Sequence, residues 1–402
     1  MDGANIVVSQ EGFQFAMTLP SVSLVIPVRN EEKFLPRCLG SLMAQDYPGE
    51  LELVVVDGRS TDKTRETAEE VFKKDGLPPN RSFRLLDNPE MRKCSGLNKA
   101  IPESKGEVSI VIDAHVFYAA DYVSKCIEIL RQTGAANVGG AMRAKPPRDT
   151  AISKAIALIH HCWFGLGGAR FHDEDAEGET YTIWMGAFPK RVFAEAGGFD
   201  VRYPRTEDIV FNRKLRELGH KLWISPKIRA WYFCRGTLRE LWKQNWANGK
   251  GVIDTLPMNR KAIGLRHLVP LLFVLSILGL LILHFALCLF HSPLFILHFA
   301  FCTLHFSFPL LLLLAELGLY LLLSIVFSFR SAFSRKSYEA LSVPVGSSAS
   351  GQFAFCTLHF AFCNAVRLFL CLPTVFLTLH LSYGVGSFIR LLQVPFVRRM
   401  WK

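Results

Sequence analysis

The sequence lacks closely spaced cysteine pairs. Its 402 residues include ten cysteines, five on each side of residue 256, but no Cys-x-x-Cys motif. Structural zinc sites and small disulfide scaffolds depend on clustered cysteines. The pattern therefore argues against both, and a reducing cytoplasm suits the soluble part of the chain.

A signal-peptide pattern is also missing. Residues 1–20 contain no basic segment followed by an apolar one, so we expect no cleaved leader. We interpret this stretch as an N-terminal extension in front of the first domain.

Acidic residues are scarce in the last third of the chain. From residue 256 onward, eleven Lys and Arg accompany only two acids, Glu316 and Glu339, among long apolar stretches. This basic excess beside apolar stretches favours membrane lipids with anionic headgroups as partners. A nucleic-acid binder would show a basic stripe within its folded domain, and none is visible. We therefore predict a soluble domain over residues 21–255, a membrane region over 256–402, and no nucleic-acid partner.

Two apolar stretches, residues 268–290 and 309–328, are each long enough to cross a bilayer. Basic residues flank them on the outer sides of the pair, namely Arg260, Lys261, Arg266, Arg330, Arg335 and Lys336. Such residues favour the cytoplasmic side of a membrane. We expect a multi-pass protein of the inner (cytoplasmic) membrane, with a two-span hairpin and a cytoplasmic soluble domain.

A third apolar stretch, residues 368–389, permits two interpretations. One more crossing would place Arg398, Arg399 and Lys402 on the far side, against the charge rule. Alternatively, part of the stretch lies in the membrane interface. We expect about three apolar helices, with the side of the C-terminus left open between these alternatives.

Histidine recurs every seven residues around the first two spans, at positions 284, 291, 298 and 305, and one Phe-rich octamer occurs at both 299–306 and 353–360. Seven-residue spacing would place the histidines on one helix face, as metal ligands require. However, no acids accompany them, and repeats of this kind commonly carry no chemistry. We interpret residues 284–308 and 338–363 as low-complexity inserts.

The strongest indication of chemistry in the soluble part is an apolar run that ends in an acid and a histidine. Residues 108–112 are apolar except for Ser109, which predicts a buried strand, and Asp113-Ala114-His115 follows directly. Open α/β sheets bind ligands at the carboxyl edge of their strands. Asp113 and His115 are therefore candidate ligands of a divalent cation that also holds a diphosphate. The alternative is an Asp in a turn with a histidine nearby.

Three further runs, residues 23–28, 51–56 and 82–86, are predicted strands separated by helical patterns. Strands that alternate with helices indicate an α/β fold with a mainly parallel sheet. Asp57, which follows the second run, then shares a sheet edge with Asp113. We predict that Asp57 accepts a hydrogen bond from a nucleobase N–H; its alternative role is that of a turn former.

Glu207 and Asp208 stand at the start of a helical pattern. The helix dipole alone favours acids there, but an acid that faces a crevice would also act as a general base toward a sugar hydroxyl. Four further residues are candidates for the pocket or for phosphate contacts: Glu31, Arg92, Lys93 and Lys250. The alternative for each is a plain role, either stabilising a helix dipole or lying solvated at the surface.

Taken in order, these motifs over roughly residues 21–255 resemble the family 2 glycosyltransferases, which have the GT-A fold. The opening strand with Pro27, Val28 and the following Arg-Asn-Glu-Glu looks like the family's start, which implies that both residues belong to the nucleotide-sugar site. Residues 57–62 look like the family's Asp-Asp/Gly-x-Ser-x-Asp turn, which implies a uracil contact for Asp57.

The remaining motifs extend the resemblance. Asp113-Ala114-His115 looks like the Asp-x-Asp metal and diphosphate motif with His in place of the second Asp, and Thr206-Glu207-Asp208 matches the family's Thr-Glu-Asp. This implies Mg²⁺ or Mn²⁺ at Asp113 and His115, and Asp208, beside Glu207, as the catalytic base.

A narrower resemblance is to the succinoglycan-biosynthesis glucosyltransferase group. Its Asp-Ala/Gly-His form agrees with His115, and residues 376–386 look like its C-terminal signature. Processive relatives carry Gln-x-x-Arg-Trp, whereas the sequence after Gln244 lacks the Arg-Trp pair. This departure favours the transfer of one sugar per encounter.

The resemblance implies a membrane-anchored, inverting hexosyltransferase that moves a sugar, with glucose favoured, from a UDP-sugar to a lipid-diphosphate-linked saccharide. Its place would be exopolysaccharide or cell-surface glycan biosynthesis, with other polysaccharide-synthesis enzymes as further partners. The alternative is a catalytically degenerate, nucleotide-binding membrane protein that scaffolds partner enzymes. A transporter is disfavoured because Glu316 is the only charge within the first two spans.

Overall fold

The computed structural model describes residues 19–74, 78–203, 205–256, 263–291, 299–334 and 354–397. Its contacts divide the chain into two compact units. The first comprises the chain up to Arg143 together with Arg170–Tyr232, and the second comprises Ala144–Ala169 together with the chain from Phe233 onward. The segment Ala144–Ala169 thus belongs with the apolar helices that follow it much later in the sequence. The predicted domains 1–20, 21–255 and 256–402 stay predictions.

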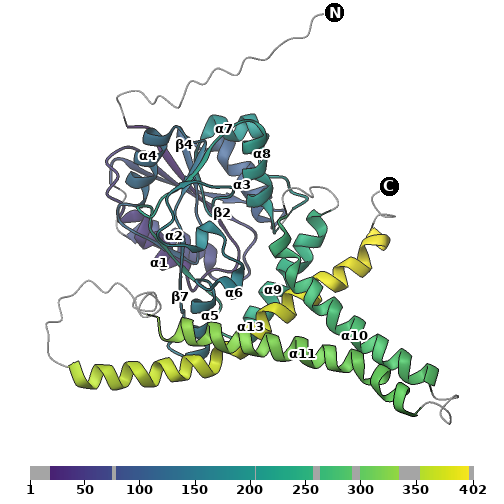
Figure 1. The fold of residues 1–402 in the computed structure, drawn as a ribbon. Coiled ribbons are helices and arrows are strands. Elements are labelled where there is room, and N and C mark those ends of the chain that lie inside the picture. Colours follow the sequence, from purple (N-terminus) through teal and green to yellow (C-terminus); the bar gives the residue numbers. More distant parts are fainter. Residues whose placement is uncertain are drawn as a thin grey trace, which may run out of the picture. The chain divides into compact units, whose positions relative to one another are not determined.

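The first unit contains an eight-stranded sheet in the order β3-β2-β1-β4-β9-β6-β10-β8 (Figure 1). A smaller sheet has the order β5-β11-β7. The strands of the large sheet are β1 (Val22–Val28), β2 (Leu51–Asp57), β3 (Arg81–Asp87), β4 (Val108–Val111), β6 (Asn137–Gly139), β8 (Gly178–Glu179), β9 (Ala187–Pro189) and β10 (Leu222–Ile224). Those of the small sheet are β5 (Val116–Tyr118), β7 (Met142–Lys145) and β11 (Ala230–Phe233).

Parallel pairing dominates the half of the large sheet that the apolar runs predicted. β1 pairs in parallel with β2 and β4, and β2 pairs in parallel with β3. All of β2 and β4 is buried, and so is nearly all of β1. Strands covered on both faces need apolar residues on both, which explains their continuous apolar sequences. The expected α/β class with a mainly parallel sheet is confirmed.

Short strands complete the sheet and were not apparent from the sequence. β9 runs antiparallel to β4 and to β6, whereas β6 and β10 are parallel and β8 is antiparallel to β10. With two or three residues each, these strands carry too little hydrophobic periodicity to predict.

The helices of the first unit flank the sheet. They are α1 (Leu35–Met43), α2 (Thr64–Lys74), α3 (Lys93–Glu103), α4 (Tyr122–Thr133), α7 (Lys190–Ala196) and α8 (Glu207–Glu217), with a 3₁₀ turn η1 (Arg170–His172). The core includes an aromatic group, with the rings of Phe199 and Phe211 4.5 Å apart between centroids. Asn98 of α3 donates to the carbonyl oxygen of Phe199 and accepts from its N–H, which fixes the loop before α8.

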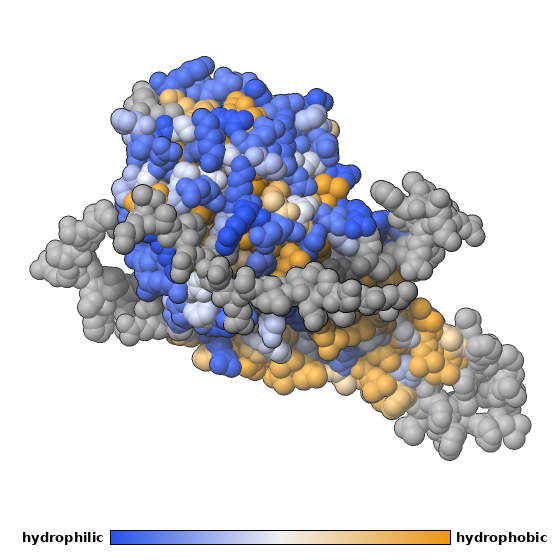
Figure 2. Space-filling view, turned by 90° about the horizontal axis from the view of Figure 1, so that it is seen from above, coloured by the Kyte–Doolittle hydropathy of each residue, from blue (hydrophilic) through white to orange (hydrophobic). Residues whose placement is uncertain are grey.

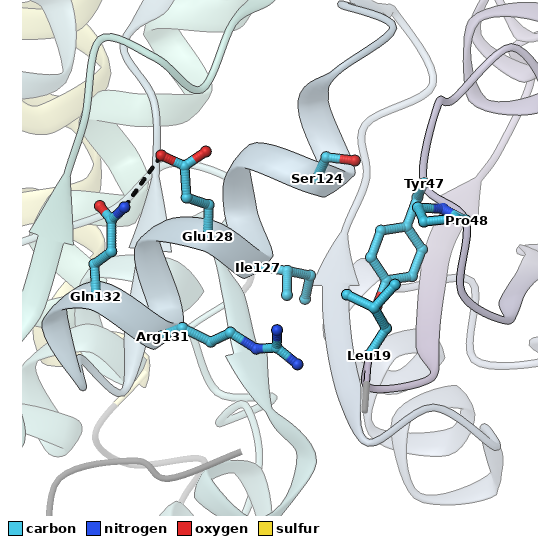
Figure 3. Close-up of a pocket in the computed structure, with 8 residues that line it drawn as sticks. All are labelled: Leu19, Tyr47, Pro48, Ser124, Ile127, Glu128, Arg131 and Gln132. Carbon is cyan, nitrogen blue, oxygen red and sulfur yellow. Dashed lines mark hydrogen bonds between the residues drawn. The ribbon is translucent and has the colours of Figure 1, made fainter. Parts of the chain in front are cut away.

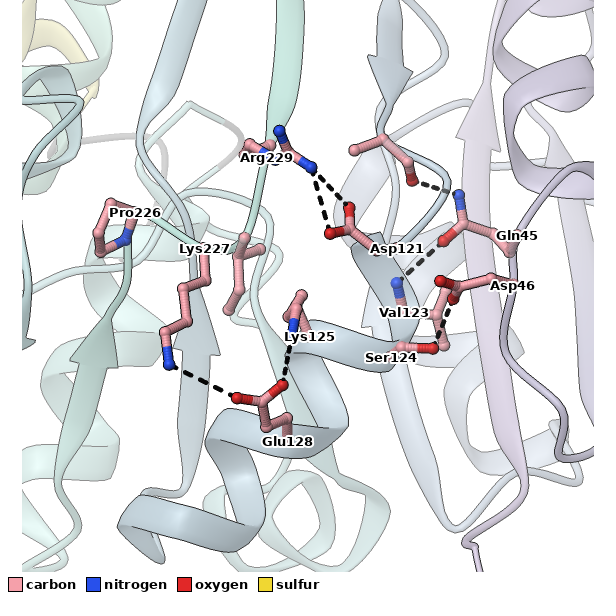
Figure 4. A network of polar contacts seen from close by, with 12 residues as sticks. Gln45, Asp46, Asp121, Val123, Ser124, Lys125, Glu128, Pro226, Lys227 and Arg229 are labelled. Carbon is pink, nitrogen blue, oxygen red and sulfur yellow. Dashed lines mark hydrogen bonds and ion pairs between the residues drawn. The ribbon is translucent and has the colours of Figure 1, made fainter.

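A polar network holds the start of α4 (Figure 4). The Gln45 side chain accepts from the backbone N–H of Val123 at 2.9 Å. Asp121 pairs with the guanidinium of Arg229 at 3.2 Å. These contacts join segments far apart in the sequence, so they fix α4 against the sheet.

The second unit is helical. It contains α5 (Ala151–Ile159), α6 (Trp163–Leu166), α9 (Leu238–Thr255), the 3₁₀ turn η3 (Leu265–His267), α10 (Val269–His291), α11 (Phe299–Ala332) and α13 (Ala354–Val397). Three helices are long and apolar enough to cross a membrane: Val269–Cys288, Phe308–Ala332 and Phe362–Gln393. The surface of these helices is largely hydrophobic in Figure 2. The three apolar helices expected from the sequence are confirmed.

The proposed low-complexity inserts lie partly outside the described residues, at 292–298 and 338–353. Their remaining residues extend α10, α11 and α13. Pro309 lies inside α11.

Glycines allow α9 and α13 to approach closely. A Cβ atom on Gly249 of α9 would overlap the backbone carbonyl oxygen of Tyr383, and one on Gly386 of α13 would overlap that of Trp246. The Ser387 hydroxyl donates to the carbonyl oxygen of Gly249 at 3.1 Å. The C-terminal signature that the sequence suggested, residues 376–386, therefore includes a helix-packing site.

We predict that Gly249→Ala and Gly386→Ala each destabilise the second unit by roughly 1–3 kcal/mol, because the atoms in the way are backbone and cannot rotate aside. The control is Gly318→Ala in α11, where an added Cβ meets no atom within 4 Å. Thermal unfolding of the detergent-solubilised protein measures the difference. Equal midpoints for all three variants would contradict the packing role.

Candidate active site

Two predicted acids lie at one edge of the sheet. β1 lies between β2 and β4, and its last residue, Val28, is in register with Asp57. The backbone N–H of Ile112 still donates to the carbonyl oxygen of Val25, so Asp113 follows at the same carboxyl edge. The parallel arrangement thus gathers Asp57 and Asp113 on neighbouring strand ends, where α/β sheets bind ligands.

Asp57 is 3% exposed and organises the turn that follows β2. Its Oδ1 accepts from the Ser60 hydroxyl at 2.6 Å and from the Ser60 N–H at 3.2 Å. Its Oδ2 lies 3.8 Å from the guanidinium of Arg65. The turn-forming role is therefore real, and it leaves Oδ2 with one long ion pair.

This turn interlocks with the turn after β1. The N–H of Asn30 donates to the Ser60 hydroxyl at 3.0 Å, and the N–H of Thr61 donates to the Asn30 side chain at 2.8 Å. The N–H of Glu31 donates to the Thr64 hydroxyl at 2.7 Å. Asn30 has a φ of 57°, a left-handed conformation that asparagine tolerates better than most residues. The two turns therefore fix each other at the edge of the site.

Lys93 joins two of the acids. Its Nζ lies 3.2 Å from Asp113 Oδ1 and 3.5 Å from Glu207 Oε1. Lys93 begins α3, Glu207 begins α8, and Asp113 follows β4, so three separate elements converge on one ammonium group. Asp208 is the next residue of α8.

The charges in this cluster shift one another's pKa. Burial by itself would lower the pKa of Lys93, but the carboxylates of Asp113, Glu207 and Asp208 raise it overall. Burial likewise opposes ionisation of Asp113, yet Lys93 and then His115 hold its pKa below the usual range. Burial and the adjacent Glu207 raise the pKa of Asp208 to about 7 against the pull of Lys93. A carboxylate of that pKa suits a general base near neutral pH.

His115 lies toward Glu31. Its Nδ1 is 3.5 Å from Glu31 Oε1, and its ring meets the ring of Tyr232 edge-on at 5.3 Å between centroids. Glu31 and His115 therefore lie close together, and Asp113 precedes His115 by two residues. That these residues line the binding pocket stays a prediction.

Within the described part of the chain, no three His, Cys, Asp or Glu residues form a ready-made metal site. Mg²⁺ and Mn²⁺, however, are commonly held by one or two protein ligands, with waters and substrate phosphates completing the shell. The carboxylate of Asp113 and the imidazole of His115 fit that mode, because both come from one short segment at the sheet edge.

The other predicted binding residues are distributed more widely. Pro27 is half-buried and Val28 is buried at the end of β1, where the Val28 carbonyl oxygen accepts from Gly58 N–H. Arg92 is exposed just before α3. Lys250 belongs to the second unit, where its Nζ lies 5.6 Å from the ring centroid of Trp246. The first unit thus contains every predicted site residue except Lys250.

The sequence analysis missed one residue that positions Asp113. The Tyr118 hydroxyl accepts from the backbone N–H of Asp113 at 2.9 Å and lies 3.3 Å from the carbonyl oxygen of Asp113. It therefore fixes the backbone that presents Asp113. Only its position five residues after Asp113 hinted at this role.

A separate pocket lies at the opposite edge of the sheet (Figure 3). Leu19 stands before β1, Tyr47 and Pro48 stand before β2, and α4 supplies the other wall with residues such as Ile127. Parallel strands begin at this edge, so the pocket is remote from the carboxyl edge and contains none of the predicted site residues.

We predict that Lys93→Met destabilises the fold most at high pH. Without the ammonium, Asp113, Glu207 and Asp208 repel one another, and the folded-state pKa values of Asp113 and Asp208 rise above the unfolded ones. The folded variant then binds extra protons, so its free energy of unfolding falls as pH increases from 5 to 8. We expect a loss of roughly 1–3 kcal/mol at pH 8, below that of a fully buried pair, because the Lys93 side chain is 36% exposed.

Lys99→Met on the same helix is the control, since Lys99 is exposed and donates to the carbonyl oxygen of Asp87. We expect it to change stability by less than about 0.5 kcal/mol. Denaturant unfolding at pH 5 and pH 8 measures both. A pH-independent loss in Lys93→Met would contradict the electrostatic account.

Comparisons with known proteins agree with this geometry. Residues 23–194 match the family model described as Glycosyl transferase family 2. The chain is 30% identical over 258 residues to the succinoglycan biosynthesis protein ExoA of Rhizobium meliloti (strain 1021), covering 63% of this chain and 76% of that protein.

It is also 27% identical over 268 residues to the dolichyl N-acetyl-alpha-D-glucosaminyl phosphate 3-beta-D-2,3-diacetamido-2,3-dideoxy-beta-D-glucuronosyltransferase of Methanococcus voltae, covering 65% of this chain and 81% of that enzyme. Among solved structures, the mannosyltransferase PcManGT from Pyrobaculum calidifontis, in complex with GDP-Man and Mn²⁺, overlaps 92% of this chain and 88% of its own, with 17% identity and a TM-score of 0.48.

The family model covers the strands that end at Asp57 and Asp113, and the first of these relatives extends the match over most of its own length. The sheet, the sequence motifs and the family model agree on the GT-A fold, and a C-terminal region of apolar helices follows it. The chain belongs to the family 2 glycosyltransferases.

Proposed function

We propose that this glycosyltransferase moves a sugar, with inversion, from a UDP-sugar to a lipid-diphosphate-linked saccharide at the cytoplasmic face of the inner membrane. The observation that carries the proposal is the convergence of Asp113, Glu207 and Asp208 on Lys93, at the sheet edge that also holds Asp57. The name of the relative ExoA, a succinoglycan biosynthesis protein, supports a role in exopolysaccharide or cell-surface glycan biosynthesis. Glucose is the favoured sugar because the sequence resembles the succinoglycan-biosynthesis glucosyltransferase group.

Asp208 serves as the catalytic base in this proposal. It takes the proton of the acceptor hydroxyl as that oxygen attacks the anomeric carbon, and the bond from that carbon to the diphosphate oxygen breaks on the opposite face. Glu207 keeps the pKa of Asp208 high, so that the base is strong enough when ionised.

The leaving diphosphate needs positive charge. Lys93 offers an ammonium group at the cluster, and Arg92 and Lys250 are further candidates for phosphate contacts. Asp113 and His115 would hold Mg²⁺ or Mn²⁺, which neutralises charge on the diphosphate when bound. At the other end of the donor, Asp57 accepts from the uracil N–H beside Pro27, Val28 and Glu31.

The membrane helices support a lipid-linked acceptor. Three apolar helices follow α9, and the basic residues around the first two favour the cytoplasmic side. A transferase held at the bilayer in this way meets a lipid-linked saccharide within the membrane surface, where other polysaccharide-synthesis enzymes would supply or consume it.

A second candidate function is a nucleotide-binding scaffold without turnover. It is favoured by His115, which stands in place of the second acid of the family's Asp-x-Asp motif. The two functions differ in one measurable respect, because a transferase releases UDP from its donor and a scaffold does not.

We predict that Asp208→Asn lowers turnover roughly 10²–10⁴-fold while UDP binding in Mn²⁺ stays unchanged, since the base touches the acceptor and not the nucleotide. Asp113→Ala should weaken Mn²⁺-dependent UDP binding as well as turnover. UDP release by the solubilised wild type, and calorimetric titration with UDP, measure the two effects.

Asp200→Asn is the matched control, because Asp200 pairs only with Arg202 in the described contacts and has no proposed role. Full turnover in Asp208→Asn would remove it as the base. Tight UDP binding without UDP release from any tested UDP-sugar would favour the scaffold.

We also predict a pH profile for turnover. Because burial and Glu207 raise the pKa of Asp208 to about 7, kcat should rise with pH through that region and level off above it. Glu207→Gln removes the neighbouring negative charge, so the midpoint should move to lower pH. Rates measured from pH 5 to pH 9 test this, and a midpoint that stays or moves upward contradicts the coupling.

A further inference from the structure

We propose that α13 lies in the plane of the membrane interface, across one end of the α10–α11 hairpin, and does not form a third crossing. Its length and composition alone permit a span. Its contacts within the second unit favour the interfacial arrangement, in which one face of α13 packs on protein and the other face contacts phospholipid.

The α10–α11 hairpin has a defined register. The Ser276 hydroxyl donates to Glu316 Oε1 at 2.5 Å, and the rings of Phe273 and Tyr320 stack at 4.8 Å between centroids. The two helices are antiparallel, so Tyr320 lies about one turn inside the start of α10 at Val269. Residues after Tyr320 in α11 are therefore at the end of the hairpin where α10 begins, which we call the open end.

The early residues of α13 contact α11 at this open end. The Phe362 ring lies 6.1 Å from that of Phe333, and the Phe369 ring lies 6.4 Å from that of Phe329, both near the end of α11. Eighteen residues after Phe362, His380 Nδ1 lies 2.9 Å from the Tyr320 hydroxyl, so this part of α13 runs obliquely along the C-terminal part of α11.

The later residues of α13 meet the same end on the other helix. Gly384 packs directly on the carbonyl oxygen of Pro270, in the first turn of α10. From Phe362 to Gly384 the helix advances about 33 Å at 1.5 Å per residue, which exceeds the hydrocarbon thickness of about 30 Å. A third span aligned with the hairpin would by then be level with the middle of α10, whereas α13 is still at the first turn of α10. Figure 1 shows α13 passing across this end.

Beyond Gly384, α13 packs on a polar helix. Arg390 pairs with Asp254 of α9 at 2.5 Å, next to the glycine contact between Gly249 and Ser387. α9 carries acids and bases along its length and is no candidate span. The C-terminal half of α13 therefore lies where charged side chains are tolerated.

The outward face of α13 is a long apolar stripe. At 100° per residue, its exposed large side chains fall within about one third of the helix circumference. They are Phe362, Leu370, Leu377, Leu391 and Leu392. The stripe extends about 45 Å, which is longer than a bilayer core but suits a helix that lies along the interface.

An aromatic residue of α6 marks the same interface. Trp163 is 68% exposed and lies 6.2 Å from Phe327, near the end of α11, while the neighbouring Phe164 packs on Phe376 and His380 of α13. Exposed tryptophan is typical of the headgroup level of a membrane. The segment Ala144–Ala169 and α13 thus form one lipid-facing platform, and the basic residues after α13 then obey the charge rule.

A protease-protection experiment tests the proposal on the full chain. Epitope tags at the N-terminus and at the C-terminus, in separate versions, are exposed to protease in intact spheroplasts and in inside-out membrane vesicles. With α13 in the interface and two spans, both tags are on the same side and are cleaved in the same preparation. Cleavage of the two tags in opposite preparations would overturn the proposal.

A matched pair of lysine variants gives a second test. Leu377 of α13 and Leu314 of α11 are 40% and 57% exposed, and Leu314 lies near the level of the middle of α10. We expect Leu377→Lys to accumulate in the membrane like the wild type, because its ammonium reaches the headgroups, whereas Leu314→Lys loses inserted protein several-fold. A loss in Leu377→Lys as large as that in Leu314→Lys would contradict an interfacial α13.

Discussion

The candidate site depends on the attraction between the Lys93 ammonium and the carboxylates around it. Three carboxylates from two elements surround it, and their mutual repulsion would otherwise oppose folding at neutral pH. The distribution of this charge is uneven, since Asp113 is kept ionised while Asp208 is held near the pH at which a base operates. Lys93 thus keeps Asp113 ionised, whereas burial and Glu207 keep the pKa of Asp208 high, so two chemically similar side chains differ in protonation.

In the second unit, the close approach of the α9 and α13 backbones is the main structural constraint. Gly249 and Gly386 let α9 and α13 meet without side chains between them, and Arg390 with Asp254 fixes how far α13 is displaced along α9. These contacts join α9, a helix of mixed polarity, to the apolar helix α13. In the interfacial arrangement that we infer, the same contact holds α13 along the bilayer surface.

Much of the site could be predicted from residue type and order. Asp57 and Asp113 follow largely apolar runs of the length and composition typical of buried parallel strands, and parallel strands bring their carboxyl ends together. The Lys93 contact could not be predicted, because nothing local fixes how α3 and α8 pack. The role of Tyr118 could not be predicted either, because its hydroxyl bonds to the backbone of Asp113 and Tyr118 belongs to no recognisable motif. The short strand β9 carries too few residues for any periodic signal.

The sequence by itself determined the α/β class, the carboxyl-edge acids and the apolar helices, because hydrophobic periodicity and helix length are local properties. Only the tertiary structure decided which acids share a cation and that Ala144–Ala169 packs with the helices of the second unit. The contacts of α13 with the open end of the hairpin are likewise tertiary. These outcomes depend on contacts between residues far apart in the chain, whose free energies arise from burial and charge in three dimensions.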